Sequence, residues 1–246
     1  MSQDVTQNKR LLLIMGETGT GKSASLREIE NPTGVLYLNC EAGKDLPFRD
    51  KFRKEIITDP NQIFDLIDEA EEDPKIHTVV IDSISMLMEM YESVHIIGAT
   101  DTRSKWVDYN QFVKELMQQY IATSEMRFIV LAHTNAELNE ETGIREVSIP
   151  VKGALKKNGL EAFFSVAVAT KKVPTKKLAK YKNDLLNITP REEAVGFKYV
   201  FQTLPTKETI GERMRGPFDL FTDEETFIDN NAGMLLDVLD EYHEGD

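Results

Sequence analysis

The chain has 246 residues, enough for one large domain, and its 41% hydrophobic and 29% charged residues are usual for soluble globular proteins. A single cysteine, Cys40, excludes an internal disulfide, and neither an apolar run of ~20 residues nor a signal-peptide core is present, so we expect a cytoplasmic protein without membrane contacts. The net charge of −13 argues against nucleic acid as a partner unless basic residues cluster locally.

The first predicted strand, residues 10–15, leads directly into a phosphate-binding loop. Residues 16–23 read GETGTGKS and match Gly-x4-Gly-Lys-Ser, between that strand and a helix predicted at residues 22–30. In such a loop the backbone N–H groups and the helix N-terminus bind phosphates, the lysine contacts the β- and γ-phosphate oxygens, and the serine hydroxyl binds Mg²⁺. The expected nucleotide-binding residues are Gly16, Glu17, Thr18, Gly19, Thr20, Gly21, Lys22, Ser23 and Ala24.

The same loop also fits a looser dinucleotide-binding pattern. Residues 19–24 read GTGKSA, which fits G-x-G-x-x-A, and Glu41 lies about twenty residues further on. A dinucleotide fold leaves Gly16 and the pair Lys22 and Ser23 unexplained, whereas a triphosphate site requires them. The triphosphate interpretation therefore takes precedence.

Strands and helices then alternate as in a parallel sheet covered by helices, which predicts an α/β fold. Further strands are expected at residues 35–39, 78–81 and 127–132, and helices at residues 59–73, 84–97 and 105–123.

Beyond residue 134 the pattern changes. A polar turn at residues 140–143 predicts a mobile hairpin within residues 134–152. Late strands are expected at residues 163–170 and 196–203, and they are predicted to be antiparallel because no amphipathic crossover helix joins them. A short helix is expected around residues 234–239.

Polar residues follow three of the predicted strands at the edge where α/β sheets bind ligands. Asp82 ends the strand 78–81, and we expect it to bind Mg²⁺ together with Ser23. Glu41 follows the strand 35–39 and is expected to activate the water that attacks the γ-phosphate. His133 is expected to contact the γ-phosphate and transmit its loss to the loop that follows. The alternatives are a helix-capping aspartate and a structural histidine.

Basic residues cluster in one segment of the acidic chain. Residues 152–182 contain nine lysines and one acid, Glu161, so this segment carries a charge of +8. It fits a track for nucleic-acid phosphates, and the alternative is a solvated lysine-rich loop. We predict a core domain at residues 1–221 that contains the basic segment, followed by an acidic C-terminal helix and tail at residues 222–246, which repels DNA or only aids solubility.

The order of phosphate loop, Glu41, Asp82 and a polar strand end at His133 resembles the core ATPase of the RecA/RadA recombinase superfamily, over about residues 9–221. It is most similar to small phage-encoded RecA-like ATPases, including single-strand annealing proteins of the Sak-four type. The resemblance implies a RecA-like P-loop NTPase fold, Mg²⁺-dependent ATP hydrolysis, and annealing or recombination of DNA. Implied partners are single-stranded DNA, further copies of the chain in a ring or filament, and a single-strand-binding protein, in the cytoplasm of a host cell.

The resemblance also implies DNA contacts from two loops and arginines that enter the ATP site of a neighbouring subunit. The corresponding loops are residues 98–106 and 135–152. The expected DNA-binding residues are Arg103, Lys105, Trp106, Arg145, Lys152, Lys156, Lys157, Lys171 and Lys172. Arg213 and Arg215 are the expected arginines acting in the neighbour, and the alternative is that they are ordinary surface residues.

Two other functions remain compatible with the phosphate loop. A P-loop nucleoside or nucleotide kinase would need an arginine-rich lid, whereas the basic segment here is rich in lysine. A nucleotide-switch loader or accessory protein would bind ATP and act through a protein partner. Replacing Glu41 with Gln distinguishes the switch from an ATPase. In an ATPase the substitution should abolish ATP turnover and spare ATP binding, whereas a pure switch has little turnover before the substitution.

Overall fold

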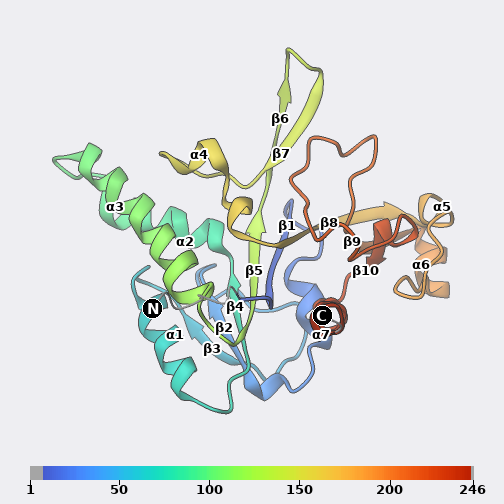
Figure 1. Cartoon of the computed structure of the whole chain (residues 1–246), viewed down its shortest axis with the longest axis horizontal. Coiled ribbons are helices and arrows are strands. Elements are labelled where there is room, and N and C mark those ends of the chain that lie inside the picture. The colour runs from blue at the N-terminus through green and yellow to red at the C-terminus, as the bar shows by residue number, and fades with distance from the viewer. Residues whose placement is uncertain (1–7, 245–246) are drawn as a thin grey trace.

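A computed structural model describes residues 8–244, which form a central eight-stranded sheet with helices around it (Figure 1). The strand order is β10-β9-β8-β1-β5-β4-β2-β3. The strands are β1 (Leu11–Gly16), β2 (Val35–Asn39), β3 (Arg53–Ile56), β4 (Thr78–Asp82), β5 (Arg127–His133), β8 (Val166–Pro174), β9 (Phe197–Gln202) and β10 (Phe227–Asp229).

The strands that carry the expected site residues are parallel neighbours. β1 pairs with β5 and β8, β5 pairs with β4, and β4 pairs with β2. In this register Gly16 lies beside His133, and Asn39 lies beside Asp82. The phosphate loop, Asp82 and His133 therefore meet at one edge of the sheet. β9 pairs antiparallel with β8 and β10, which confirms the mostly parallel α/β fold with antiparallel late strands.

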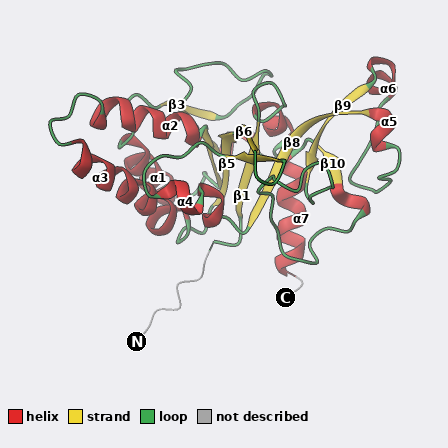
Figure 2. Cartoon of the chain, turned by 90° about the horizontal axis from the view of Figure 1, so that it is seen from above, coloured by secondary structure: helices red, strands yellow, loops and turns green. Residues whose placement is uncertain are grey.

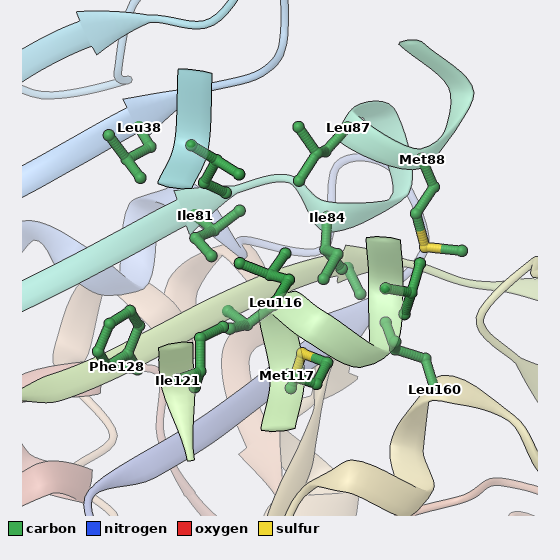
Figure 3. Close-up of a cluster of buried hydrophobic side chains, with 14 of the residues drawn as sticks. Leu38, Ile81, Ile84, Leu87, Met88, Leu116, Met117, Ile121, Phe128 and Leu160 are labelled. Atoms are coloured by element: carbon green, nitrogen blue, oxygen red, sulfur yellow. The ribbon is translucent and has the colours of Figure 1, made fainter. Parts of the chain in front are cut away.

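Both faces of the sheet are buried, as the continuous apolar strands predict. Side chains alternate along β1, so Leu11 and Leu13 belong to one hydrophobic cluster and Leu12 and Ile14 to another. Figure 2 shows the helices on opposite sides of the sheet, and Figure 3 shows part of the first cluster, where sheet and helix side chains meet. The helices over the first cluster are α1 (Gln62–Glu72), α2 (Ile84–Tyr91) and α3 (Thr102–Glu115); over the second lie the 3₁₀ helix η1 (Ser23–Glu28) and α7 (Ala232–Glu244).

The helices differ from their predicted bounds in several places, and α1 begins at Gln62, three residues later than predicted. α3 begins at Thr102, three residues early, because the Asp101 side chain accepts hydrogen bonds from the backbone N–H groups of Arg103 and Ser104. The predicted loop 98–106 is therefore shorter, and its basic residues lie on a helix. The helix after the phosphate loop is the short η1, since the Ser25 N–H bonds to carbonyls both three and four residues back. α2 and α3 continue into the π-helical turns η3 (Glu92–Ile96) and η4 (Leu116–Ile121).

The predicted hairpin is present as β6 (Asn135–Asn139) and β7 (Ile144–Ser148), paired antiparallel. It projects from the molecule beyond the end of β5 (Figure 1). The loop before β10 runs beside it, and the Val147 N–H donates to the Gly211 carbonyl at 2.9 Å. The hairpin is thus continuous with His133, the last residue of β5, through Thr134 alone.

Several short elements lack a strong sequence pattern. β3 alternates half-buried and exposed residues and pairs only with β2 at the edge of the sheet, so its apolar content is low. β10 has three residues. The other short helices are η2 (Pro32–Gly34), α4 (Leu155–Asn158), η5 (Leu160–Phe163), α5 (Thr175–Leu178), α6 (Pro190–Val195) and η6 (Glu224–Thr226).

The predicted core domain and the predicted acidic C-terminal part both contribute to the fold. Residues 1–7 and 245–246, which belong to these predicted parts, lie outside the described residues. The basic segment 152–182 contributes β8, which pairs with β1 at the centre of the sheet. α7, in the predicted acidic end, buries Leu235, Leu236 and Leu239 in the second cluster. Within the described part, no helix is long and apolar enough to cross a membrane.

Candidate nucleotide site

The phosphate loop turns between β1 and η1 and forms one wall of a cavity of about 320 Å³. Gly19 and Gly21 have φ values of 79° and 102°, a region that favours glycine, so the loop requires them. The cavity is lined by Thr18, Gly19, Gly21, Lys22, Ser23, Ala24, Tyr37, Glu41, Lys44, Asp45, Pro47, Asp82, His133 and Tyr199. Gly16, Glu17 and Thr20 instead line a cavity of about 270 Å³ on the other side of the loop.

Asp82 is held at the end of β4 by two hydroxyl groups. Ser23 Oγ donates to Asp82 Oδ2 at 2.8 Å, and the buried Tyr37 hydroxyl donates to the same oxygen at 2.7 Å. Burial raises the pKa of Asp82, and these hydrogen bonds offset part of that rise. Asp82 Oδ1 is buried and has no hydrogen-bond partner within the described protein.

These residues fit a magnesium ion. The buried, unpartnered Asp82 Oδ1 lies on the same carboxylate that accepts from Ser23, and hard oxygen ligands are what Mg²⁺ prefers. Among the described residues, no group of three or more His, Cys, Asp or Glu side chains forms a metal site. In nucleotide sites Mg²⁺ is usually bound by few protein oxygens together with phosphate and water, and Ser23 and Asp82 would be those protein ligands here.

Lys22 is buried, and its ammonium lies at the centre of the loop. It donates to the Gly16 carbonyl at 3.0 Å, to the Glu17 carbonyl at 3.1 Å and to His133 Nδ1 at 3.2 Å. Burial lowers the pKa of Lys22 to about 8, although Asp82 and Glu41 favour the charged form.

We expect ATP binding to take up about half a proton at pH 8, because Lys22 is then about half deprotonated and phosphate anions favour its charged form. Affinity for ATP should therefore fall as the pH rises above 8. Below about pH 7 Lys22 is already protonated, so its titration should no longer change the affinity. Calorimetric titrations at pH 8 in buffers of different ionisation enthalpy measure the uptake. Equal observed enthalpies in all buffers would contradict the shifted lysine.

Glu41, His133 and Lys22 form a continuous chain of contacts. His133 Nε2 lies 2.8 Å from Glu41 Oε1, while Nδ1 accepts from Lys22, so the neutral imidazole donates to Glu41. Lys44 Nζ donates to the other carboxylate oxygen, Glu41 Oε2, at 2.9 Å. Burial would raise the pKa of Glu41, but the hydrogen bonds from His133 and Lys44 lower it overall. The carboxylate is thereby kept ionised near neutral pH.

Ser85 fixes the backbone at the end of β5. Its hydroxyl accepts from the His133 N–H at 2.9 Å and donates to the His133 carbonyl at 3.4 Å. The structure thus brings together the residues predicted for the phosphate and metal site from four separate strand ends: Lys22, Ser23, Glu41, Asp82 and His133.

The residues predicted to bind DNA lie on several elements, and three of them, Arg145, Lys171 and Lys172, line the cavity of about 270 Å³. Trp106 is partly buried against the first cluster, with its ring edge-on to Tyr109 at 5.4 Å between centroids. Trp106 therefore packs against its own helix and the first cluster, and its predicted base stacking stays a prediction. Arg103 is exposed on α3, and Lys105 pairs with Asp108 at 2.9 Å.

Acidic side chains pair with several of the basic residues predicted to bind DNA. Arg145 on the hairpin pairs with Glu17 of the phosphate loop at 2.6 Å. Lys152 pairs with Glu92 at 2.5 Å, and Lys171 pairs with the buried carboxylate of Glu212. Lys172 lies over the ring of Phe197, 3.8 Å from its centroid.

Lys156 and Lys157 on α4 have no ion-pair partner between residues 8 and 244. Lys157 lines a shallow groove of about 300 Å³ together with Arg213 and Arg215. Arg213 Nη1 lies 3.5 Å from Glu161 Oε2, and Arg215 Nη1 donates to the Glu161 carbonyl at 3.4 Å. Both arginines are exposed and neither lines the nucleotide cavity of its own chain.

Five residues that line the cavity are missing from the sequence-based prediction: Tyr37, Lys44, Asp45, Pro47 and Tyr199. Tyr37 lies two residues before Asn39 in β2, so the alternation of strand side chains directs both to the same face. Lys44 follows Glu41 by three residues, and a charge pair at that spacing is a weak signal. Tyr199, on β9, reaches the cavity from a distant part of the chain and carries no sequence signal for it.

The fold and the phosphate loop define a P-loop nucleotide-binding protein, with the loop between a central parallel strand and a helix. The AAA domain family matches residues 8–182, more than half of the chain, so the chain belongs to this family of P-loop ATPase domains.

Similarities to individual proteins add little beyond the family. No curated protein matches the chain. Among solved structures, the chain is similar to a KaiC-like protein from the hyperthermophilic archaeon Pyrococcus horikoshii OT3, with 12% identity and a TM-score of 0.45 over 90% of this chain and 89% of that one.

Proposed function

We propose that the protein is a Mg²⁺-dependent, RecA-like ATPase of the small phage-encoded type, which binds single-stranded DNA and promotes annealing or recombination. The observation that carries the hydrolytic part is the chain of contacts from Lys22 through His133 to Glu41, at 3.2 and 2.8 Å, inside the cavity at the phosphate loop. It supports hydrolysis because a phosphate-binding lysine and an ionised carboxylate share one site.

In the proposed reaction a water oxygen attacks the γ-phosphorus. Glu41 orients this water and accepts its proton, the bond from the γ-phosphorus to the β–γ bridging oxygen breaks, and ADP and phosphate leave. Lys22 binds the β- and γ-phosphate oxygens. Ser23 and Asp82 are the residues that would hold Mg²⁺, which supplies positive charge to the phosphates when bound.

His133 connects the proposed reaction to the projecting hairpin. Its imidazole bridges Lys22 and Glu41, and its backbone leads through Thr134 into β6. Loss of the γ-phosphate changes the charge that these side chains face, so the position of His133 should respond to hydrolysis. The hairpin would carry that response to whatever binds at its tip.

The proposal for DNA draws on the resemblance to recombinases and on the exposed basic residues. Lys156 and Lys157 are exposed neighbours on α4 and have no ion-pair partner within residues 8–244. Such a cluster can bind backbone phosphates even on an acidic protein. Self-association into a ring or filament, and contact with a single-strand-binding protein, complete the proposal.

ATPase rates with and without single-stranded DNA across a salt series test this function. We expect DNA to bind at low salt and to raise turnover. Replacing Lys156 and Lys157 with Ser should reduce the slope of log K against log salt by about 0.7 for each DNA phosphate that the variant no longer neutralises. The matched control is the pair Lys9→Ser and Lys75→Ser, exposed lysines outside the basic segment that come just before β1 and β4, and it should leave the slope unchanged.

Absence of DNA binding by the unaltered protein at low salt would exclude the recombination function. Turnover that persists without DNA would then favour a different ATPase, and absence of turnover would favour the nucleotide switch. Transfer of the γ-phosphate to a nucleoside or nucleotide in place of water would identify a kinase.

A further inference from the structure

Lys44 is a second cation at the nucleotide cavity, and the local backbone fixes where it lies. It belongs to the turn after β2, which the buried Asn39 side chain organises. Asn39 Oδ1 accepts from the N–H groups of Glu41 and Gly43 at 2.9 and 3.3 Å, and Asn39 Nδ2 donates to the Lys44 carbonyl at 2.9 Å. The position of Lys44 relative to Glu41 is therefore built into the turn.

The ammonium of Lys44 lies at the mouth of this cavity. Its side chain is 68% exposed, whereas that of Glu41, which it contacts at 2.9 Å, is 14% exposed. The hydrogen bond to Glu41 raises the pKa of Lys44, so the ammonium stays charged. An ammonium has three donors, and one bond to Glu41 leaves two for another acceptor.

The charges that line the cavity indicate what that acceptor is. Its ionised lining consists of the carboxylates of Glu41, Asp45 and Asp82 against the ammonium groups of Lys22 and Lys44. Asp82 is assigned to Mg²⁺, so without Lys44 a terminal phosphate would face the carboxylates of Glu41 and Asp45 with one lysine. Like charges at short range are strongly unfavourable in a partly buried site. Lys44 lies against Glu41, the carboxylate proposed to approach the γ-phosphate.

We infer that Lys44 is a catalytic residue that contacts the γ-phosphate and so makes the site selective for nucleoside triphosphate over diphosphate. This inference rests on the proposed binding of ATP at this cavity. Before the reaction, the ammonium of Lys44 reduces the repulsion between Glu41 and the terminal phosphate. During the reaction it stabilises the negative charge on the departing γ-phosphate. Lys22 holds the β-phosphate in both ligands, so it does not distinguish them to the same extent.

The test measures affinity for fluorescent ATP and ADP analogues in the presence of Mg²⁺, without DNA and without relying on turnover. Lys44→Ala should weaken ATP binding by at least about tenfold, as expected for a charge-assisted hydrogen bond, and change ADP binding by less than about twofold. Lys44→Arg should retain most of the preference for ATP. The matched control, Lys51→Ala, removes an exposed lysine of the same loop that does not line the cavity and should change neither affinity.

Three results would overturn the inference: equal losses for ATP and ADP, no loss for either, or the same loss in Lys51→Ala. Thermal unfolding midpoints of the variants establish that each is folded. The proposed function is tested by other measurements. The ratio of the ATP and ADP affinities can be measured even if the protein neither turns over ATP nor binds DNA. A turnover defect in Lys44→Ala with an unchanged affinity ratio would mean that Lys44 only positions Glu41, and it too would overturn the inference.

Discussion

Glu41→Gln is expected to lower ATP turnover by about 10²- to 10⁴-fold while leaving ATP affinity within about twofold. The amide keeps the size of the side chain and can still accept from His133 or Lys44 at one oxygen. It cannot accept a proton from water at neutral pH, so the loss falls on the chemical step. Steady-state turnover and equilibrium binding of ATP, measured on the same preparation, separate the two quantities.

An exposed carboxylate on α1 supplies the control for this substitution. Glu72→Gln makes the same chemical change far from the cavity and should leave turnover unchanged. Parallel losses of turnover and affinity in Glu41→Gln would assign Glu41 to binding and not to proton transfer. Full turnover in Glu41→Gln would remove it from the reaction altogether.

The site edge could be predicted because its elements are local in sequence. The phosphate loop needs glycine where φ is near 80° and 100°, at Gly19 and Gly21, and the sequence has glycine at both positions. Glu41, Asp82 and His133 each end an apolar run, and parallel pairing brings such ends together. Chain order and strand polarity therefore suffice to assemble this part of the site.

Other contacts join residues that are far apart in the sequence, and local sequence patterns do not predict which of them meet. Lys171 and its partner Glu212 are 41 positions apart, and they meet because the late loop runs beside β8. Arg145, which lies next to the hairpin turn, and Glu17 of the phosphate loop are 128 positions apart. A count of lysines therefore overstates the free positive charge of the basic segment.

Trp106 illustrates the same limit for an aromatic residue. From sequence, a tryptophan between basic residues is compatible with base stacking or with packing. In the structure Trp106 lies on α3, edge-on to Tyr109 and partly buried against the first cluster. Which side of α3 faces the sheet depends on how the helix packs, and the residues next to Trp106 do not specify that packing.

Replacing Arg213 and Arg215 together with Ala is expected to lower ATP turnover by about 10³-fold or more, the usual effect of losing an arginine that stabilises the transferring phosphate. Both are exposed, and they line a groove with Lys157 that is separate from the nucleotide cavity of their own chain. We therefore expect them to contact a γ-phosphate that is bound to a second copy. ATP affinity of the isolated chain should therefore change little.

Mixing two inactive variants tests this geometry directly. In a mixed assembly, a subunit lacking Arg213 and Arg215 still has Glu41, and a neighbouring Glu41→Gln subunit still has both arginines, so the site between them is complete. Turnover should reappear on mixing, and it should depend on total protein concentration as self-association requires. If the arginines act within their own chain, every site in the mixture lacks one component, and turnover stays at the level of the separate variants.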